Sequence, residues 1–117
     1  MNERDSKALA RIIVHIDKII EYTNQIHTLD DFNQNQLVLD AVVFNLTQIG
    51  EIAKLRVSTS LKEMNPSIPW HAMYGLRNRM VHDYDQINMN IVYDTVKDDI
   101  PYLRDEIIKI MIKDASK

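Results

Sequence analysis

The sequence predicts an all-α fold, a single-domain up-and-down bundle of four to five helices that occupies residues 1–117. Apolar residues recur at helical spacing along most of the chain, which is typical of amphipathic helices. Only two glycines and three prolines occur in 117 residues, and 45% of the residues are apolar. A chain of this length and composition is large enough to bury one hydrophobic core.

Two long helices are predicted in the first half of the chain. Residues 3–27 carry apolar side chains on one face, at Leu9, Ile12, Ile13, Ile16, Ile19, Ile20 and Tyr22. Residues 34–57 are apolar nearly all the way round, so this helix is buried on more than one side, within the bundle or at a subunit interface. Gly50 lies inside it, where glycine costs about 1 kcal/mol relative to alanine, and we expect another chain segment to approach closely there.

The second half begins with a short helical turn over residues 59–65 and a rigid loop from Pro66 to Pro69. Pro69 suits the first position of the next helix, where its missing N–H group would have no partner. Trp70 is better explained as a packing anchor than as a platform for base stacking, because apolar neighbours are available. The last helix covers residues 89–113, and Pro101 is expected to kink or split it.

Composition excludes several classes of function. The chain has no cysteine, which removes disulfides, thiol catalysis and thiolate-bound metals. Its net charge of −3 counts against general nucleic-acid binding but leaves room for a local site. Glycine is too scarce for a dinucleotide or P-loop fold, and no zinc motif is present, so no cofactor or metal is expected. No apolar run approaches the roughly 20 residues of a membrane span, and we expect a cytoplasmic soluble protein.

The densest chemistry lies in the ten residues from Gly75 to Tyr84, which hold two arginines, an asparagine, a histidine, an aspartate and a tyrosine. In a helix, Asn78 and His82 are one turn apart, and Arg77 and Tyr84 are two turns apart. Arg77 and His82 are separated by about 140° around the axis, so they converge only if Arg77 reaches around the helix. A cation and an imidazole near each other can hold a phosphate.

The form Arg77-Asn78-x-x-Val81-His82-x-Tyr84 resembles the signature of the HEPN superfamily, and the tyrosine resembles its HepT-like toxin branch. Two outlying segments fit the same branch, Leu46 to Lys54 around Ile49-Gly50-Glu51 and Pro66 to Trp70, together with an Arg4-Asp5 start and a late Pro101-x-Leu103. The chain departs from the pattern at Asn45, where an arginine is common, and at Ile52, where an alanine is common.

The chemistry of these residues suits metal-independent RNA cleavage. Arg77 would bind and polarise a phosphate, His82 would act as acid, base or orienting group, and Asn78 would fix the imidazole or contact substrate. The motif offers one histidine, whereas cleavage is best served by both an acid and a base. The resemblance implies a homodimer with a site across its cleft, which would supply two.

The resemblance also implies the toxin component of a type II toxin-antitoxin system. Its partners would be RNA as substrate and a cognate MNT-type nucleotidyltransferase antitoxin. The antitoxin would silence the toxin by adenylylation of Tyr84, whose added phosphodiester could occupy Arg77.

Several alternatives stay open. Glu51 is either a solvated charge or a carboxylate that orients Arg77 or His82, and Arg79 is better explained as a surface partner of Asp83 than as a supporting group of the site. His15 and His27 are interpreted as ordinary helix residues because they lack metal-ligand spacing. The whole motif could instead form ion pairs inside an interface. The domain could also be a non-catalytic nucleotide- or RNA-binding module that accompanies a nucleotidyltransferase.

Overall fold

The computed structural model describes the chain except Asp83, and of Tyr84 it describes the backbone but not the side chain. All the regular elements among the described residues are helices, and these residues hold no strand. The elements are α1 (Glu3–Tyr22), α2 (Leu29–Asn33), α3 (Gln36–Leu55), α4 (Thr59–Met64), α5 (Trp70–His82), η1 (Tyr84–Gln86), α6 (Met89–Asp94), η2 (Thr95–Asp99) and α7 (Ile100–Ala115). The expected all-α bundle is confirmed.

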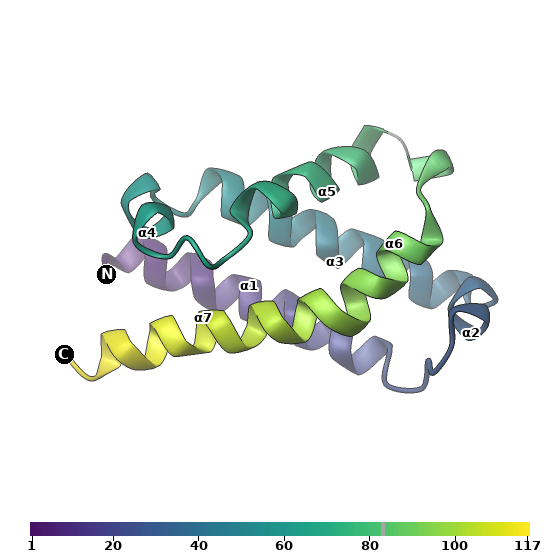
Figure 1. Ribbon diagram of the computed structural model, residues 1–117, viewed down its shortest axis with the longest axis horizontal. Helices are drawn as coiled ribbons and strands as arrows, with labels where there is room; N and C mark the ends of the chain where they lie inside the picture. Colours follow the sequence, from purple (N-terminus) through teal and green to yellow (C-terminus); the bar gives the residue numbers. More distant parts are fainter. Residues whose placement is uncertain (83) are drawn as a thin grey trace.

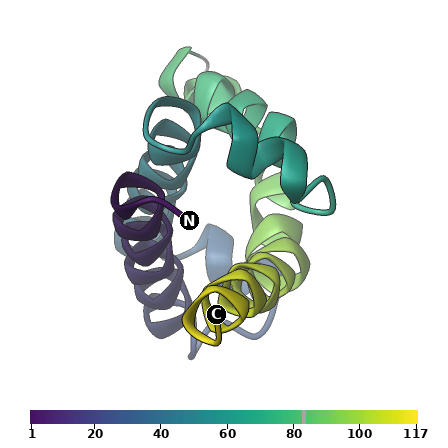
Figure 2. The ribbon, with the colours of Figure 1, turned by 90° about the vertical axis from the view of Figure 1, so that its left-hand side faces the viewer.

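The long helices lie roughly along one axis, and α3 occupies the centre of the sequence of packed helices (Figure 1). It packs against α1 on one side and α5 on the other, while α7 packs against α1 (Figure 2). The short helices α2 and α4 lie at opposite ends of the molecule. Because α3 has a helix on either side, it is buried on two sides, and this burial explains the nearly continuous apolar pattern of its sequence.

The core is built mainly from the apolar faces of α1, α3 and α7, and the shorter helices add further side chains to it. Its largest fully buried side chains are Leu9, Ile12, Ile16, Ile19, Phe32, Val42, Val92 and Ile107. One charged residue belongs to this interior: Asp5 accepts hydrogen bonds from the Ser58 backbone N–H at 2.8 Å and the Ser58 hydroxyl at 2.6 Å. Asp5 therefore ties the start of α1 to the start of α4 without being left unpaired.

Three expected helix boundaries were wrong. α1 ends at Tyr22 rather than His27, because the backbone N–H groups of Asn24 and Ile26 donate to carbonyls three residues back, at Glu21 and Thr23, and so form turns in place of an α-helix. Pro69 precedes α5 rather than opening it, and its carbonyl accepts the first helical bond, from the Met73 N–H at 3.1 Å. α5 ends at His82, so Tyr84 belongs to η1 and the helical spacing from Arg77 does not extend to it.

The last helical rod is split as Pro101 predicts. α6 passes into α7 through η2, a π-helical turn, and Pro101 occupies the second position of α7. Proline has no N–H group to donate to the preceding turn, and a wider turn is one way for a helix to accommodate that loss. No helix among the described residues is long and apolar enough to cross a membrane.

Candidate functional site

The site is built around the contact between α3 and α5. A Cβ atom added to Gly50 would collide with the Arg77 Cβ and would lie 2.7 Å from the Met73 carbonyl oxygen. Real Cβ atoms do not approach a carbonyl oxygen this closely, so the two helices reach their separation only with glycine at position 50. The close approach expected at Gly50 is confirmed, and the residue that approaches is the motif arginine itself.

Glu51 holds the guanidinium of Arg77. The Arg77 Nε atom lies 2.7 Å from Glu51 Oε2, with side chains that are 24% and 36% exposed. The Nε–H does not have hydrogen-bond geometry toward the carboxylate, so the contact is an ion pair. Of the two interpretations of Glu51, the structure supports the carboxylate that orients Arg77.

Asn78 adds a second contact to the same guanidinium. The Arg77 Nη1 atom donates to Asn78 Oδ1 at 2.9 Å, from the neighbouring position of α5. Glu51 and Asn78 thus hold Arg77 from two sides, at its Nε and its Nη1. The geometry fixes the orientation of the group that would meet a phosphate.

His82 lies at the end of α5 and is exposed. Its ring makes no hydrogen bond or ion pair with the residues that the structure describes. Asn78 is also exposed, one helical turn earlier. Both side chains are therefore accessible to a ligand, and they lie on the same surface as the exposed part of the Arg77 side chain.

Arg79 points away from this group. It lies in two hollows on the other side of α5, one bordered by Ile91 and Asp99 and one by Gln86 and Asn88. A shift of two positions along a helix moves a side chain about 200° around the axis, which explains the separation from Arg77. The structure thus does not bring Arg79 to the site, and its expected pairing with Asp83 lies outside the described residues.

Several other candidates prove to be structural. His15 is buried, and its Nδ1 lies 2.8 Å from Asn45 Oδ1, so Asn45 joins α3 to α1 rather than supporting the motif. Trp70 is buried and its Nε1 donates to the Asn65 carbonyl at 3.1 Å, which confirms a packing anchor. The described residues contain no group of three or more histidine, aspartate or glutamate side chains able to hold a metal ion.

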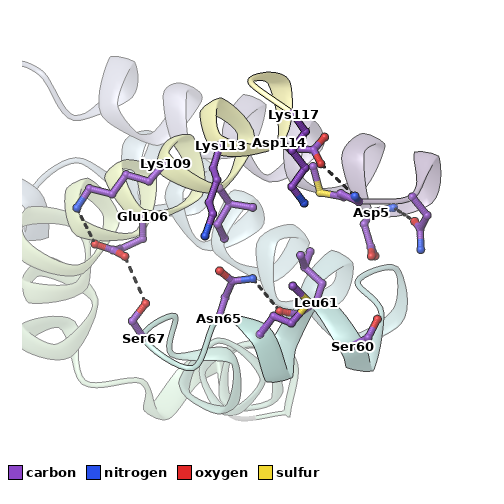
Figure 3. A pocket seen from close by; sticks show the side chains of 14 residues that line it. Asp5, Ser60, Leu61, Asn65, Ser67, Glu106, Lys109, Lys113, Asp114 and Lys117 are labelled. Carbon is purple, nitrogen blue, oxygen red and sulfur yellow. Dashed lines mark hydrogen bonds and ion pairs between the residues drawn. The ribbon is translucent and has the colours of Figure 1, made fainter.

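Another hollow, at the far end of the molecule, is lined by paired charges (Figure 3). Lys109 lies 3.2 Å from Glu106, and the amino group of Met1 lies 3.0 Å from Asp114. Ser67 donates to Glu106 at 3.3 Å. This hollow, between α4, α7 and the start of α1, contains no residue of the motif.

Sequence reasoning missed a group of basic side chains that belong to α1 and to the end of α3. Arg4, Lys7 and Arg11 of α1 line a hollow with Arg56, directly after α3. The signal was present in the sequence, because cations at positions i, i+3 and i+7 lie on one face of a helix. Only the packing of α1 on α3 shows that Arg56 joins them.

Fold and site together define a small all-helical domain that presents an arginine, an asparagine and a histidine from α5, with the arginine held by a carboxylate of α3, which packs beside it. Comparison with known families gives a match to the family model described as Ribonuclease HepT-like over residues 12–110. The chain belongs to this HepT-like ribonuclease family.

Curated relatives agree over nearly full length. The chain is 33% identical to "Putative RNase MJ1380" of Methanocaldococcus jannaschii, over 92% of this chain and 97% of the relative. It is 33% identical to "Probable ribonuclease HepT" of Thermococcus cleftensis, over 81% of this chain and 84% of the relative. It is 35% identical to "Putative RNase MJ1216" of M. jannaschii, over 97% and 93%. A search of solved structures found no match.

Proposed function

We propose that this chain is a metal-independent endoribonuclease, the toxin component of a type II toxin-antitoxin system, with a composite arginine and histidine site across a homodimer. The observation that carries the proposal is Arg77, held by Glu51 and Asn78 on the exposed helix that ends in His82. Membership of the HepT-like ribonuclease family and the names of the relatives support RNA as the substrate.

The reaction needs only groups that the protein and the RNA supply. The 2′-oxygen attacks the adjacent phosphorus, the bond from phosphorus to the 5′-oxygen breaks, and a 2′,3′-cyclic phosphate and a 5′-hydroxyl result. One imidazole takes the proton of the 2′-hydroxyl and another gives a proton to the departing 5′-oxygen. Arg77 neutralises the negative charge that grows on the non-bridging phosphate oxygens.

A homodimer would provide the second imidazole. Exposed apolar side chains gather on the side of α3 that neither α1 nor α5 covers and on the adjoining edge of α5, where Leu37 is 82% exposed, Phe44 61% and Val81 49%. Removing such side chains from water favours association, and a two-fold axis would bring the two motif helices to one cleft. The expected dimer is therefore supported by a surface beside the site.

Adenylylation of Tyr84 would silence the enzyme. A partner nucleotidyltransferase would join the Tyr84 oxygen to the α-phosphorus of ATP, with pyrophosphate leaving and the phenolic proton passing to a base of the partner. Tyr84 is two residues after His82, so the added phosphodiester and adenosine would lie next to the motif. The tyrosine side chain itself lies outside the described residues.

The test compares cells induced to make the wild-type chain with cells making Arg77→Ala, His82→Ala or His71→Ala. His71 is the matched control, an exposed histidine at the other end of α5. We expect growth arrest and RNA cleavage by wild type and His71→Ala, undiminished by EDTA in purified protein, and loss of 10²-fold or more in the other two. RNA binding without cleavage by wild type would instead indicate the non-catalytic module.

A separate assay tests the antitoxin. Co-expression with the cognate nucleotidyltransferase should add the mass of adenylate to wild type and not to Tyr84→Phe, as measured by mass spectrometry of the intact chain. An unmodified wild-type chain after co-expression would contradict this part of the proposal.

A further inference from the structure

We infer that the groove between α1 and α3 binds the phosphate backbone of RNA that leads into the site. We define this basic groove by Arg4, Lys7, Arg11, Gln48, Ile52 and Arg56, which line a hollow of about 620 Å³. The inference rests on the proposed function, because it assigns the path of the substrate.

The first step is charge. The chain carries a net charge of −3, yet this hollow gathers four cations and one carboxylate, Glu3. An isolated surface charge is usually solvated and does little, but several cations lining one concave surface make a local field of opposite sign to the rest of the molecule. Such a field attracts a polyanion, and it suits a phosphate backbone better than an isolated anion.

The second step is availability. The guanidinium groups of Arg11 and Arg56 have no ion-pair or side-chain hydrogen-bond partner among the described residues. Lys7 lies 3.2 Å from Glu3, but those side chains are 77% and 83% exposed, and such surface pairs are weak enough to exchange for a phosphate. Arg4 has a structural contact instead, since its Nη2 donates to the Leu55 carbonyl at 2.7 Å and holds α1 against the end of α3.

The third step is geometry. Arg4 and Arg11 are seven residues apart on one face of α1, which spans about 10 Å along the helix axis. Arg56 faces them from the end of α3, which lies beside α1 (Figure 2). Cations that are spread over about 10 Å, on both walls of the hollow, can contact successive phosphates of an RNA strand. A cluster on one helix turn would hold a single phosphate.

The fourth step joins the groove to the site. Arg4, Gln48, Ile52 and Arg56 also line a smaller hollow, and Glu51 is part of its wall. The Glu51 carboxylate is the group that contacts Arg77 at 2.7 Å. The basic groove therefore opens directly beside the residue that orients the motif arginine, across the exposed ridge of α3. An RNA strand held in the groove would have its next phosphates near Arg77.

RNA accounts for these observations better than an acidic protein surface. The free groups are mainly arginines, whose planar forks match phosphate oxygens in pairs, and the apolar residues that line the hollow, Ala8 and Ile52, are buried and offer a protein partner no apolar anchor. Backbone contacts carry no sequence information, so the groove would set affinity and register and leave the cleavage position to the site.

The experiment measures binding of a fluorescein-labelled, random-sequence 2′-O-methyl oligoribonucleotide, which lacks the attacking hydroxyl and cannot be cut. The test variant is Lys7→Gln/Arg11→Gln/Arg56→Gln, which leaves the structural Arg4 in place. Its charge-matched control is Lys109→Gln/Lys113→Gln/Lys117→Gln in the far hollow of Figure 3, where Lys109 also belongs to an exposed surface pair. Thermal unfolding checks that both variants fold.

We expect the test variant to bind RNA about 10- to 100-fold more weakly in 0.1 M salt, with a salt dependence of log Kd that is shallower by about 2, or roughly 0.7 for each lost phosphate contact. The control should stay within about twofold of wild type, and Arg11→Lys/Arg56→Lys should keep most of the affinity because the charges remain.

Three results would overturn the inference, and they differ in what else they affect. Wild type that cleaves RNA, with a test variant that binds like the control, would remove the groove and leave the proposed function intact. Wild type that neither binds nor cleaves RNA would remove both. A test variant that binds RNA normally but loses its nucleotidyltransferase partner would show that the groove is a protein-docking surface.

Discussion

Gly50 is the residue on which the separation of α3 and α5 depends. In Gly50→Ala the new Cβ meets the Arg77 Cβ and the Met73 carbonyl, so the helices must move apart. We expect a loss of about 1–3 kcal/mol in the free energy of unfolding, as in overpacked cores, together with weaker RNA cleavage because Arg77 shifts. Chemical denaturation measures the first effect and the cleavage rate the second.

The matched control is Gly75→Ala in α5. A Cβ at Gly75 meets nothing within 4 Å, and alanine is favoured over glycine inside a helix by about 0.5–1 kcal/mol. This variant should be as stable as wild type or more so, with unchanged cleavage. Equal effects of the two substitutions would show that helix propensity, rather than the contact with Arg77, decides the outcome at Gly50.

Glu51 is a positioning residue in this account, because it acts through Arg77. Glu51→Gln keeps the shape of the side chain and removes its charge, so the guanidinium loses its ion-pair partner. We expect kcat for RNA cleavage to fall on the order of 10-fold with little change in KM, since orientation matters most in the transition state. Stability should change by less than about 1 kcal/mol, because the pair is partly exposed.

Asp17→Asn serves as the control for Glu51. Asp17 lies 2.8 Å from Arg104 Nε, in an ion pair between α1 and α7 that contains no motif residue. This substitution also breaks a carboxylate–arginine pair but should leave kcat unchanged. A Glu51→Gln enzyme with wild-type kcat would show that Asn78 alone suffices to orient Arg77.

At the level of elements, apolar periodicity predicts most of the fold. It locates the long helices to within a few residues of their ends, except at the end of α1, where the backbone forms turns after Tyr22. The presence of a glycine inside a predicted helix also identifies position 50 as a point of close approach. The π turn of η2 is not predictable in this way, because the same apolar spacing fits an α-helix with a kink at Pro101.

The site is predictable in part for a different reason. The residue types Arg77, Asn78 and His82 follow from the motif, since they belong to one helix. The partnership of Arg77 with Glu51 joins two helices, so composition and spacing leave it open and only the resemblance favoured it. Arg79 is adjacent to Asn78 in sequence, yet helix geometry places it on the other side of α5, away from Arg77.

The π turn has a measurable electrostatic consequence. Partial desolvation raises the pKa of Asp99, and the nearby charges of Asp98 and Asp94 raise it further. A π-helix brings residues five apart into register, which places Asp94 one turn from Asp99. The folded state therefore binds a proton at Asp99 more tightly than the unfolded state, and this contribution to stability is lost as pH rises through the raised pKa.

Replacing the carboxyl tests that sign. Asp99→Asn should raise Tm at neutral pH, by the equivalent of about 0.2–0.5 kcal/mol, the size of a like-charge pair on a helix. The gain should shrink as pH falls through the raised pKa and vanish below the ordinary range of an aspartate. Calorimetry at several pH values measures it, with Asp105→Asn on α7 as control. A gain that persists unchanged in acid would indicate a packing effect instead.

At the scale of the whole molecule, the exposed side of α3 combines three surfaces. The apolar residues Leu37 and Phe44 lie in its first half, whereas Glu51 with Arg77 and the basic groove lie side by side toward its C-terminal end. A monomer gains nothing from leaving a side chain as large as Phe44 in water next to a charged site. The arrangement is explained if the apolar part is covered by a second copy while the charged parts remain open to substrate.

That explanation predicts how assembly and activity are coupled. Phe44→Glu places a charge at the centre of the apolar part and should convert a dimer to a folded monomer, as measured by light scattering with size-exclusion chromatography. Cleavage should fall in parallel, because a monomer keeps Arg77 but lacks the second histidine, whereas RNA affinity per chain should fall less than cleavage because the basic groove is intact.

Ile112→Glu is the control for this substitution, since Ile112 is 63% exposed on α7 and therefore comparable to Phe44 at 61%. Ile112→Glu should leave both the molar mass measured by light scattering and the rate of RNA cleavage unchanged. Mixing Phe44→Glu with an excess of wild-type chain should not restore its activity if the charge blocks pairing. A Phe44→Glu protein that is monomeric and still cleaves at the wild-type rate would show that one chain holds the complete site, with both the acid and the base.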